Sequence, residues 1–297
     1  MILLQNLQAG LSLGILWGIA ALGVYITFRI LNIADLTCDG SFALGGCING
    51  ILLLNGANPL FALLIAIIGG MLSGLITGLF HTLLKIPPIL SGILTMIALY
   101  SVGLRVLGGP NKSLLGKVTL FTYLSDELGI PSSWSRLLVG VIVSAFVIAL
   151  LYWFFGTELG CAIRATGNNE YMVRALGVDT NSIKLLGLVI SNGLIALSGA
   201  LISQLNRTSD VGDGRGAIVI TLASIVIGEV IFGKRFNFVY ILVSVVIGAA
   251  VYRMIIAIVL YLGLNTDDMK LFTALVVALA LGIPAIKQQL SLKRTPA

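Results

Sequence analysis

Charged residues are scarce in this chain. Asp, Glu, Lys and Arg make up only 10% of its 297 residues, while 58% are hydrophobic and the mean hydropathy is +1.07. An ordinary soluble domain is about 25% charged. There is too little polar surface here to coat a water-soluble globule, which excludes a cytosolic enzyme, a disordered chain and a nucleic-acid-binding domain. The net charge of +6 fits excess Lys and Arg in cytoplasmic loops. The composition therefore predicts a polytopic membrane protein.

The usual signatures of catalysis are also missing. The sequence has no GxxxxGK[ST] phosphate loop, no HExxH motif and no cluster of Cys and His. Its single histidine, His81, is expected to be a hydrogen-bonding residue at the membrane interface. The three cysteines form no CxxC pair, and we interpret Cys38, Cys47 and Cys161 as small buried thiols. We expect no catalytic residue, no metal site and no cofactor held by this chain.

Long apolar runs predict an all-α bundle of about eight to ten membrane spans in a single domain over residues 1–297. About 20 apolar residues cross the hydrocarbon core. Nine segments meet this criterion, and the most polar of them are candidates for half-spans: Leu7–Phe28, Leu36–Leu54, Pro59–Leu84, Pro88–Leu107, Ser135–Phe155, Lys184–Gln204, Gly216–Phe232, Phe238–Leu262 and Leu271–Ile286.

The basic residues predict the orientation of these spans. Lys and Arg concentrate in cytoplasmic loops. Alternate connections each carry at least one of them, at Arg29, Lys85, Arg164 to Lys184, and Lys234 with Arg235, and the C-terminal segment is also basic. We therefore expect the C-terminus in the cytoplasm and, with nine spans, the N-terminus outside.

Two stripes of glycine predict close helix packing. Gly10, Gly14 and Gly18 recur at four-residue spacing, and so do the glycines at 70, 74 and 78. Residues four apart share one helix face, so each stripe forms a smooth groove for a neighbouring helix. That neighbour is either another helix of this chain or a helix of a second copy.

The segment 156–184 concentrates charge in a chain that has little. Gly167 and Asn168 are suited to break one helix and cap the next, and Glu170 would then lie in the first turn, where an anion complements the helix dipole. Arg174 follows Glu170 at i+4, and Gly177 ends the helix. We predict a short amphipathic cytoplasmic helix between Asn168 and Leu176.

That helix would have an apolar face available for contact. Tyr171, Met172 and Ala175 would be free to dock elsewhere. The features themselves fit either a protein partner or a helix lying on lipid.

Three motifs resemble one family of membrane permeases. They are Gly160-x3-Arg164-Ala165-x-Gly167-x-Asn169…Arg174-x-x-Gly177, the segment Asn32–Gly46, and the glycine-rich segment Gly214–Gly228. Together they resemble the inner-membrane permeases of the branched-chain amino-acid and monosaccharide ABC importers, over roughly residues 10–285. The segment Asn32–Gly46 is also similar to the subgroup that serves aromatic amino acids such as tryptophan or tyrosine. Asp35 and Asp39 depart from the more neutral pattern expected of branched-chain permeases, which puts the substrate in doubt.

The resemblance implies a mechanism and a set of partners. Two permease subunits, expected as a homodimer in the bacterial plasma membrane, would form the pore, and two separate ATPase subunits holding ATP and Mg would bind from the cytoplasm. An extracellular or lipoprotein solute-binding protein would deliver the substrate to the outer loops. The predicted cytoplasmic helix would be the coupling helix seated in the ATPase. The residues expected to couple the two subunits are Arg164, Gly167, Asn168, Glu170, Tyr171, Arg174 and Gly177.

Charges inside the membrane are costly and are candidates for the translocation path. Asp35, Asp39, Ser41 and Arg253 are the predicted path residues, and Asp39-Gly40-Ser41 is predicted to break its helix beside a cavity. In the alternative interpretation, Asp35 caps its span and Asp39 pairs with a neighbour. Arg253 needs a partner, for which Asp39 and Glu229 are the candidates.

The sequence supports a permease of an ABC importer for a small solute, an amino acid above all. The first competing hypothesis is an ion-coupled secondary transporter that uses Asp35, Asp39 and Arg253. A second is a membrane scaffold that transports nothing.

Overall fold

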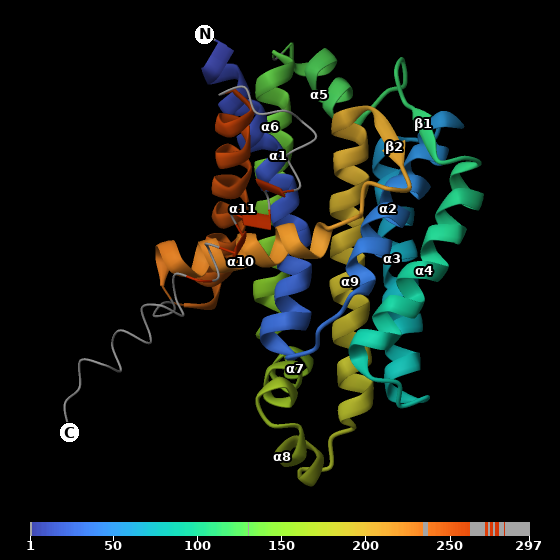
Figure 1. The fold of residues 1–297 in the computed structure, drawn as a ribbon, viewed down its shortest axis with the longest axis vertical. Helices are drawn as coiled ribbons and strands as arrows, with labels where there is room; N and C mark the ends of the chain where they lie inside the picture. The colour runs from blue at the N-terminus through green and yellow to red at the C-terminus, as the bar shows by residue number, and fades with distance from the viewer. Residues whose placement is uncertain are drawn as a thin grey trace, which may run out of the picture.

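Long apolar helices run side by side along the molecule (Figure 1). The structure, a computed structural model, describes residues 2–129, 131–233 and 237–261 and scattered positions between 271 and 282. The long helices are α1 (Ile2–Tyr25, extended by the π-helical turn η1, Ile26–Ile30), α2 (Thr37–Leu54), α3 (Pro59–Thr82), α4 (Pro88–Leu107), α6 (Ser132–Phe155), α9 (Thr180–Asn206) and α11 (Phe238–Tyr261). Each has a segment long and apolar enough to cross a membrane. The predicted all-α polytopic bundle is confirmed.

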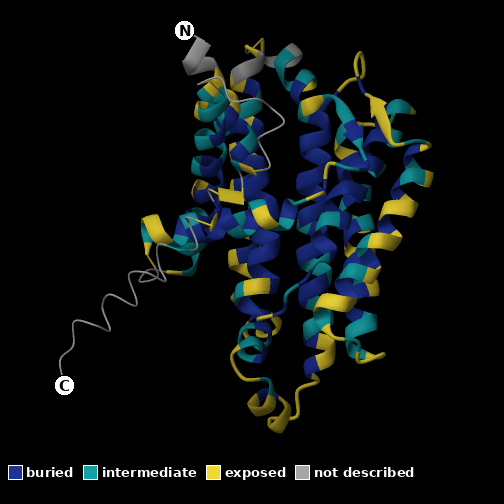
Figure 2. Cartoon of the chain, viewed as in Figure 1, coloured by how far each residue is buried: buried dark blue, intermediate teal, exposed yellow. Residues whose placement is uncertain are grey.

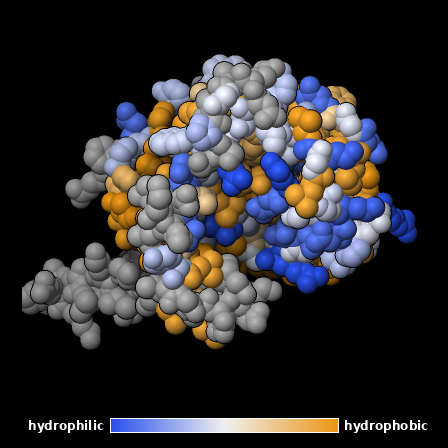
Figure 3. All heavy atoms as spheres, turned by 90° about the horizontal axis from the view of Figure 1, so that it is seen from above, coloured by the Kyte–Doolittle hydropathy of each residue, from blue (hydrophilic) through white to orange (hydrophobic). Residues whose placement is uncertain are grey.

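Short elements close the two ends of the bundle. The end that carries the N-terminus also holds α5 (Leu120–Leu128) and the antiparallel pair of strands β1 (Asn111–Ser113) and β2 (Thr208–Asp210), whereas α7 (Glu158–Asn168) and α8 (Glu170–Ala175) project from the opposite end (Figure 1). Figure 3 looks onto the first of these ends, where polar residues gather over the side that carries the strands. Figure 2 shows buried residues running through the middle of the bundle along its whole length.

The eighth apolar helix differs from the others in length and direction. α10 (Ala217–Phe232) has 16 residues, about 24 Å at 1.5 Å per residue, which is less than the roughly 30 Å of hydrocarbon in a bilayer. It lies across the bundle instead of along it and begins in the middle (Figure 1). The predicted span Gly216–Phe232 is therefore not a full crossing. The ninth predicted span, Leu271–Ile286, the loop residues Lys234 and Arg235, and the basic C-terminal segment lie mainly or wholly outside the described residues.

α2 also begins inside the bundle. After η1 the chain climbs back toward mid-height through residues 31–36, which we call the α1–α2 connection (Figure 1). Asn32 takes a left-handed conformation there, with φ of 55°, and the Asp35 carboxylate accepts a hydrogen bond from the Thr37 amide at 2.9 Å, which caps the first turn of α2. The helix is continuous through Asp39, Gly40 and Ser41. The predicted break at those three residues is therefore wrong, because the chain leaves helical geometry before Thr37.

Both glycine stripes are filled by helices of this chain. α1 packs its stripe on α11: a methyl group added to Gly14 would lie 2.6 Å from the Cα of Ala250. α3 packs its stripe on α9: a methyl group on Gly74 would lie 2.4 Å from the Leu188 carbonyl oxygen. The stripes are occupied within the chain, so the dimer-seam alternative for them is wrong.

The α3–α9 contact gives a stability prediction. Replacing Gly74 by Ala forces its new methyl group against backbone that cannot rotate away, and such overpacking costs roughly 1–3 kcal/mol. We expect a lower midpoint of thermal unfolding for the detergent-solubilised protein. Gly140→Ala is the matched control, because its methyl group would make ordinary contacts at 3.5 Å with Ile15. Equal midpoints for the two variants would contradict the packing described for α3 and α9.

Candidate functional site

The N-termini of α2 and α10 meet at one carboxylate in the middle of the bundle. Asp39, in the first turn of α2, accepts a hydrogen bond from the Gly216 amide at 2.9 Å and another from the Ile218 amide, also at 2.9 Å. Each carboxylate oxygen takes one of these two bonds, and Oδ1 also accepts from the Cys38 thiol, whose sulfur lies 3.6 Å away. The first amides of a helix have no partner within the helix, and its N-terminus carries partial positive charge. Asp39 therefore fixes where α10 begins.

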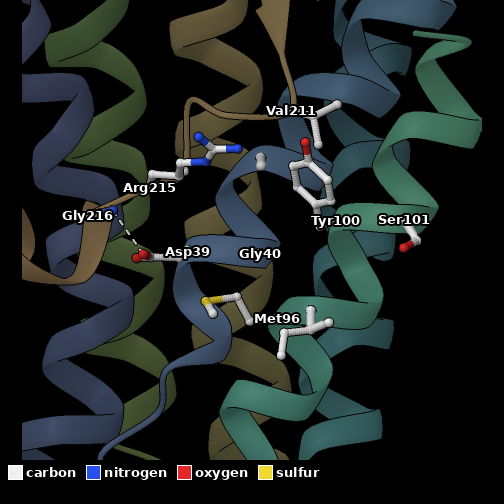
Figure 4. Close-up of a pocket in the computed structure, with 11 residues that line it drawn as sticks. Asp39, Gly40, Met96, Tyr100, Ser101, Val211, Arg215 and Gly216 are labelled. Atoms are coloured by element: carbon white, nitrogen blue, oxygen red, sulfur yellow. Dashed lines mark hydrogen bonds between the residues drawn. The ribbon is translucent and has the colours of Figure 1, made fainter. Parts of the chain in front are cut away.

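A cavity of about 410 Å³ lies beside this junction (Figure 4). Its walls come from α2, from the face of α4 around Met96 and Tyr100, and from residues 211–216, which join β2 to α10. The volume falls in the range of small-molecule sites, roughly 300–1,000 Å³. Apolar side chains dominate the walls, and the polar side chains among them are Asp39, Arg215 and the hydroxyls of Tyr100 and Ser101.

Arg215 extends over the cavity toward Tyr100 (Figure 4). Its guanidinium carbon lies 5.7 Å from the centre of the Tyr100 ring, a cation–π contact. In the part of the chain that the structure describes, no carboxylate oxygen comes within 4.0 Å of this side chain, since the three ion pairs there involve other residues. The guanidinium thus faces the cavity with an aromatic ring as its neighbour and its donors open.

Glycine makes this wall of the cavity. A methyl group on Gly214 would lie 1.9 Å from the Asp39 carbonyl oxygen, so residues 211–216 approach α2 more closely than any side chain allows. Gly216 has a φ of 86°, a left-handed conformation that suits glycine, just before α10 begins. The local sequence Gly-Arg-Gly is therefore what holds Arg215 over the cavity.

Two of the predicted path residues lie behind the cavity in a buried polar network. Asp35 accepts a hydrogen bond from the Asn192 amide group at 2.8 Å, and Ser41 donates one to the other end of Asn192 at 2.6 Å. Ser41 also bonds Ser73 at 2.6 Å. Thr37 continues the network to α3 and α4 through hydroxyl contacts with Thr77, which in turn donates to Thr95. The network ties α2, α3, α4 and α9 together, and of the predicted path residues only Asp39 lines the cavity.

Arg253 is separate from this site. Its guanidinium carbon stacks over Trp17 at 4.5 Å from the ring centre, and it lines a different cavity between α1 and α11. Glu229 instead pairs with Arg29, joining α10 to η1, the turn that extends α1. The prediction that Arg253 pairs with Asp39 or Glu229 is wrong, because Arg253 lies on the side of α11 that packs against Trp17 of α1.

The projecting end contains two helices, one more than the sequence predicted. The predicted helix between Asn168 and Leu176 is confirmed as α8, but residues 158–168 form the separate helix α7. Thr157 caps α7, and its hydroxyl accepts from the Gly160 amide. The cap of α8 is Asn169, whose side chain accepts from the Met172 amide at 3.1 Å, and Asn168 is the last residue of α7. The prediction that Asn168 caps the second helix is therefore wrong by one residue.

α7 is locked to the α1–α2 connection by direct backbone contact. A methyl group on Gly167 would lie 1.7 Å from the Ile30 carbonyl oxygen, and the Asn32 side chain donates to the Gly167 carbonyl oxygen at 3.0 Å. Arg164, one turn earlier on α7, turns back toward the bundle. It donates to the Phe155 carbonyl oxygen and lies over the Phe238 ring at 5.2 Å. Gly167 and Arg164 thus anchor α7 to the bundle.

α8 is held by charges on the side that faces α9. Glu170 bonds Arg174 at 2.7 Å and Lys184 at 2.6 Å, and the Thr180 hydroxyl joins them. The hydrogen bond from the Lys184 ammonium is the main reason that the pKa of Glu170 lies below its ordinary value. Gly177, with φ of 83°, ends this turn of chain.

The outer side of α8 is apolar and open. Tyr171 is 84% exposed, Met172 52% and Leu176 74%. This six-residue helix ties its charged side chains to one another and to α9, and leaves aromatic and aliphatic side chains exposed on its other side. The structure thus gathers all seven predicted coupling residues at one end. Arg164, Gly167, Glu170 and Gly177 hold the local shape, Asn168 ends α7, Tyr171 is exposed, and Arg174 is both bonded to Glu170 and exposed.

Sequence reasoning missed Arg215, Tyr100 and Met96. One signal for Arg215 was available: a charged residue between two glycines at the start of an apolar segment too short to cross a membrane. No comparable signal marks Tyr100 or Met96, because an aromatic or a methionine in an apolar helix has the same pattern whether it faces lipid, core or cavity.

Removing the Asp39 carboxylate should loosen the start of α10. We expect Asp39→Ala to increase hydrogen exchange at Gly216, Ile218 and their neighbours, and to cost about 0.5–2 kcal/mol, as the loss of a helix cap does. Hydrogen exchange read by mass spectrometry on the full chain in detergent measures the first effect and thermal unfolding the second. Asp213→Ala, on the exposed side of the same loop, is the control and should leave both readouts unchanged.

The ion pairs of Glu170 give a pH prediction. Because the folded-state pKa is lowered, the stabilisation is complete above the ordinary carboxyl value of 4.5 and is lost as the pH falls through the lower folded value. Protection of α8 against hydrogen exchange should therefore fall in acid, and Glu170→Gln should lower it already at pH 7. Glu158→Gln, an exposed residue in α7, should not. Unchanged protection in Glu170→Gln would contradict the role given to this cluster.

Comparison with known proteins agrees with the three motifs. Residues 6–283 match the family model described as branched-chain amino acid transport system / permease component. The chain is 40% identical over 282 residues to the tyrosine transport system permease protein of Clostridioides difficile (strain R20291), covering 94% of this chain and 90% of that one. It is 27% identical over 224 residues to the galactofuranose transporter permease protein YtfT of Escherichia coli (strain K12), covering 74% and 62%.

The fold is also found among solved structures. PsaBC from Streptococcus pneumoniae in complex with Fab aligns over 94% of this chain and 91% of its own, with a TM-score of 0.52 and 15% identity. That likeness concerns the fold alone. The match through nearly all of the sequence, carried by a multi-pass bundle of membrane helices, means that the chain belongs to the permease family of branched-chain amino acid transport systems.

Proposed function

We propose that this chain is the membrane-spanning subunit of an ATP-driven importer and that its cargo is an amino acid with an aromatic side chain. The observation that carries the proposal is the cavity at mid-height, where a guanidinium and a carboxylate lie among apolar side chains. Its volume of about 410 Å³ falls within the range of small-molecule sites. The relative named for tyrosine transport, at 40% identity, supports the aromatic cargo.

Energy would come from a different polypeptide. The sequence has no phosphate loop, so ATP and Mg would be held by separate ATPase subunits. α8 would be the coupling helix, with Tyr171, Met172 and Leu176 seated in a groove of the ATPase. The charged cluster around Glu170 would keep α8 rigid so that movement of the ATPase reaches the bundle.

A short route would carry that movement to the cavity. α7 meets the α1–α2 connection at Gly167 and Asn32. Near its end the connection carries Asp35, which accepts a hydrogen bond from the first amide of α2, and Asp39 one turn later holds the start of α10 and the cavity wall. A shift of α7 would therefore displace the connection and re-aim two helix N-termini together.

The remaining partners follow from the same proposal. Two copies of the chain, as a homodimer, would form the pathway in a bacterial plasma membrane. A solute-binding protein would dock on the end that carries β1, β2 and α5, which would face outward, and α7, α8 and the C-terminus would lie in the cytoplasm. The ion-coupled alternative is less supported, because it needs Asp35, Asp39 and Arg253 on one path, and Arg253 lines a different cavity.

A reconstituted complex tests the proposal. The chain, co-expressed with its ATPase and binding protein and placed in liposomes, should take up labelled tyrosine or tryptophan only when ATP is supplied on the ATPase side. Uptake of no amino acid under these conditions would overturn the function proposed here.

The coupling helix has its own test. Tyr171→Asp should weaken association with the ATPase by roughly 10–30-fold, the effect of losing a central apolar contact, measured by retention of the ATPase during purification. The substitution spares the chain's own fold, because the Tyr171 side chain is 84% exposed. Leu115→Asp, with 72% exposure at the opposite end, is the control. If Tyr171→Asp retains the ATPase like the wild type, α8 is not the coupling helix.

A further inference from the structure

We infer that Arg215 and Tyr100 form a carboxylate anchor, and that the cavity selects a carboxylate with a bulky apolar or aromatic body without reading its amino group. This inference rests on the proposed function, because it takes the cavity as the substrate site. It is carried by the contacts of Arg215, Tyr100 and Asp39 in the cavity wall.

Arg215 is the group in this wall with open capacity. Its guanidinium lies 5.7 Å from the centre of the Tyr100 ring and, within the described ranges, outside the 4.0 Å ion-pair limit of any carboxylate. Arginine offers a planar fork of donors that matches a carboxylate in a bidentate arrangement. Stacking on an aromatic face leaves the edge of that fork free, so the ring orients the donors without occupying them.

Asp39 is directed to the start of α10 and not to the ligand space beside Arg215. Both of its oxygens already accept backbone hydrogen bonds at 2.9 Å from the start of α10, and the positive end of that helix offsets its charge. Its carboxylate points toward Gly216 and away from the Tyr100 ring (Figure 4), so an amine on a ligand held at Arg215 would not lie against it. The cavity as a whole is therefore a site for an anion, although its wall contains one acid and one base.

The rest of the wall suits a bulky apolar body. Ala43, Met96, Ile97 and Val211 line it together with the Tyr100 ring. Methionine adapts to aromatic partners and makes favourable contacts between its sulfur and their rings. A ligand whose carboxylate lies at Arg215 would place its side chain against these residues and the ring of Tyr100.

Three ligands separate the groups that the cavity reads. L-tyrosine has both an amine and a carboxylate, 3-(4-hydroxyphenyl)propionate has only the carboxylate, and tyramine has only the amine. Binding of each to the purified wild-type permease in nanodiscs, without binding protein, is measured by the shift in thermal unfolding and by calorimetry. We expect tyrosine and the propionate to bind within a few-fold of each other, and tyramine at least roughly tenfold more weakly, the effect of losing a hydrogen-bonded charge partner.

Variants assign that difference to the anchor. Arg215→Gln should weaken binding of both carboxylates by roughly tenfold or more and leave the weak binding of tyramine unchanged. Arg215→Lys should recover part of the loss, because it restores the charge without the planar fork. Arg105→Gln removes an exposed positive charge from α4 outside the cavity and is the control. Thermal unfolding without ligand establishes that each variant is folded.

The outcomes distinguish this inference from the proposed function. Tyramine binding as tightly as tyrosine, the propionate binding at least roughly tenfold more weakly than tyrosine, carboxylate binding unaffected by Arg215→Gln, or no binding of any of the three ligands would overturn this inference. ATP-driven uptake of tyrosine or tryptophan in the reconstituted complex would still uphold the proposed function in each of those cases. Because the ligand series uses the wild-type protein, the inference stays falsifiable even if Arg215→Gln fails to fold.

Discussion

The hydrogen bonds between Asp39 and the start of α10 organise the centre of this permease. A helix that begins inside a bilayer leaves amides without water or a neighbouring carbonyl, and each unpaired group there is costly. The Asp39 carboxylate accepts hydrogen bonds from two of these amides. Its own helix, α2, also begins inside the bundle and is capped by Asp35. Two interrupted segments thus become a stable junction, and the wall of the cavity is built from the chain that connects them.

Fold class and the positions of most helices could be predicted from sequence because they depend on summed properties. Hydropathy over some 20 residues, glycine at four-residue spacing and Asn or Gly at helix ends are local signals, and α3, α4, α8 and both packing stripes follow from them. The direction of α10 does not follow. Its composition is that of a membrane helix, and only its 16-residue length and its contact with Asp39 distinguish it.

The candidate site was predictable at its charged positions and not at its partners. Asp35 and Asp39 stand out in an apolar segment, but which group each one bonds depends on how α9 and α10 pack against α2. The error at Arg253 has the same cause. Its depth along the helix suggested candidate partners, but which group it contacts depends on helix packing, and in the structure that group is Trp17. Tyr100 belongs to the site because Arg215, from a loop far along the chain, packs against its ring.

The buried network around Asn192 limits how the bundle can rearrange. Ser41, Ser73, Thr37 and Asp35 find their partners in the buried interior, shielded from the bulk solvent that could replace a stretched hydrogen bond. Intermediate positions of the α1–α2 connection would strand several of these groups at once. Motion of the α1–α2 connection is therefore expected to be bistable, with two complete sets of hydrogen-bond partners separated by a barrier.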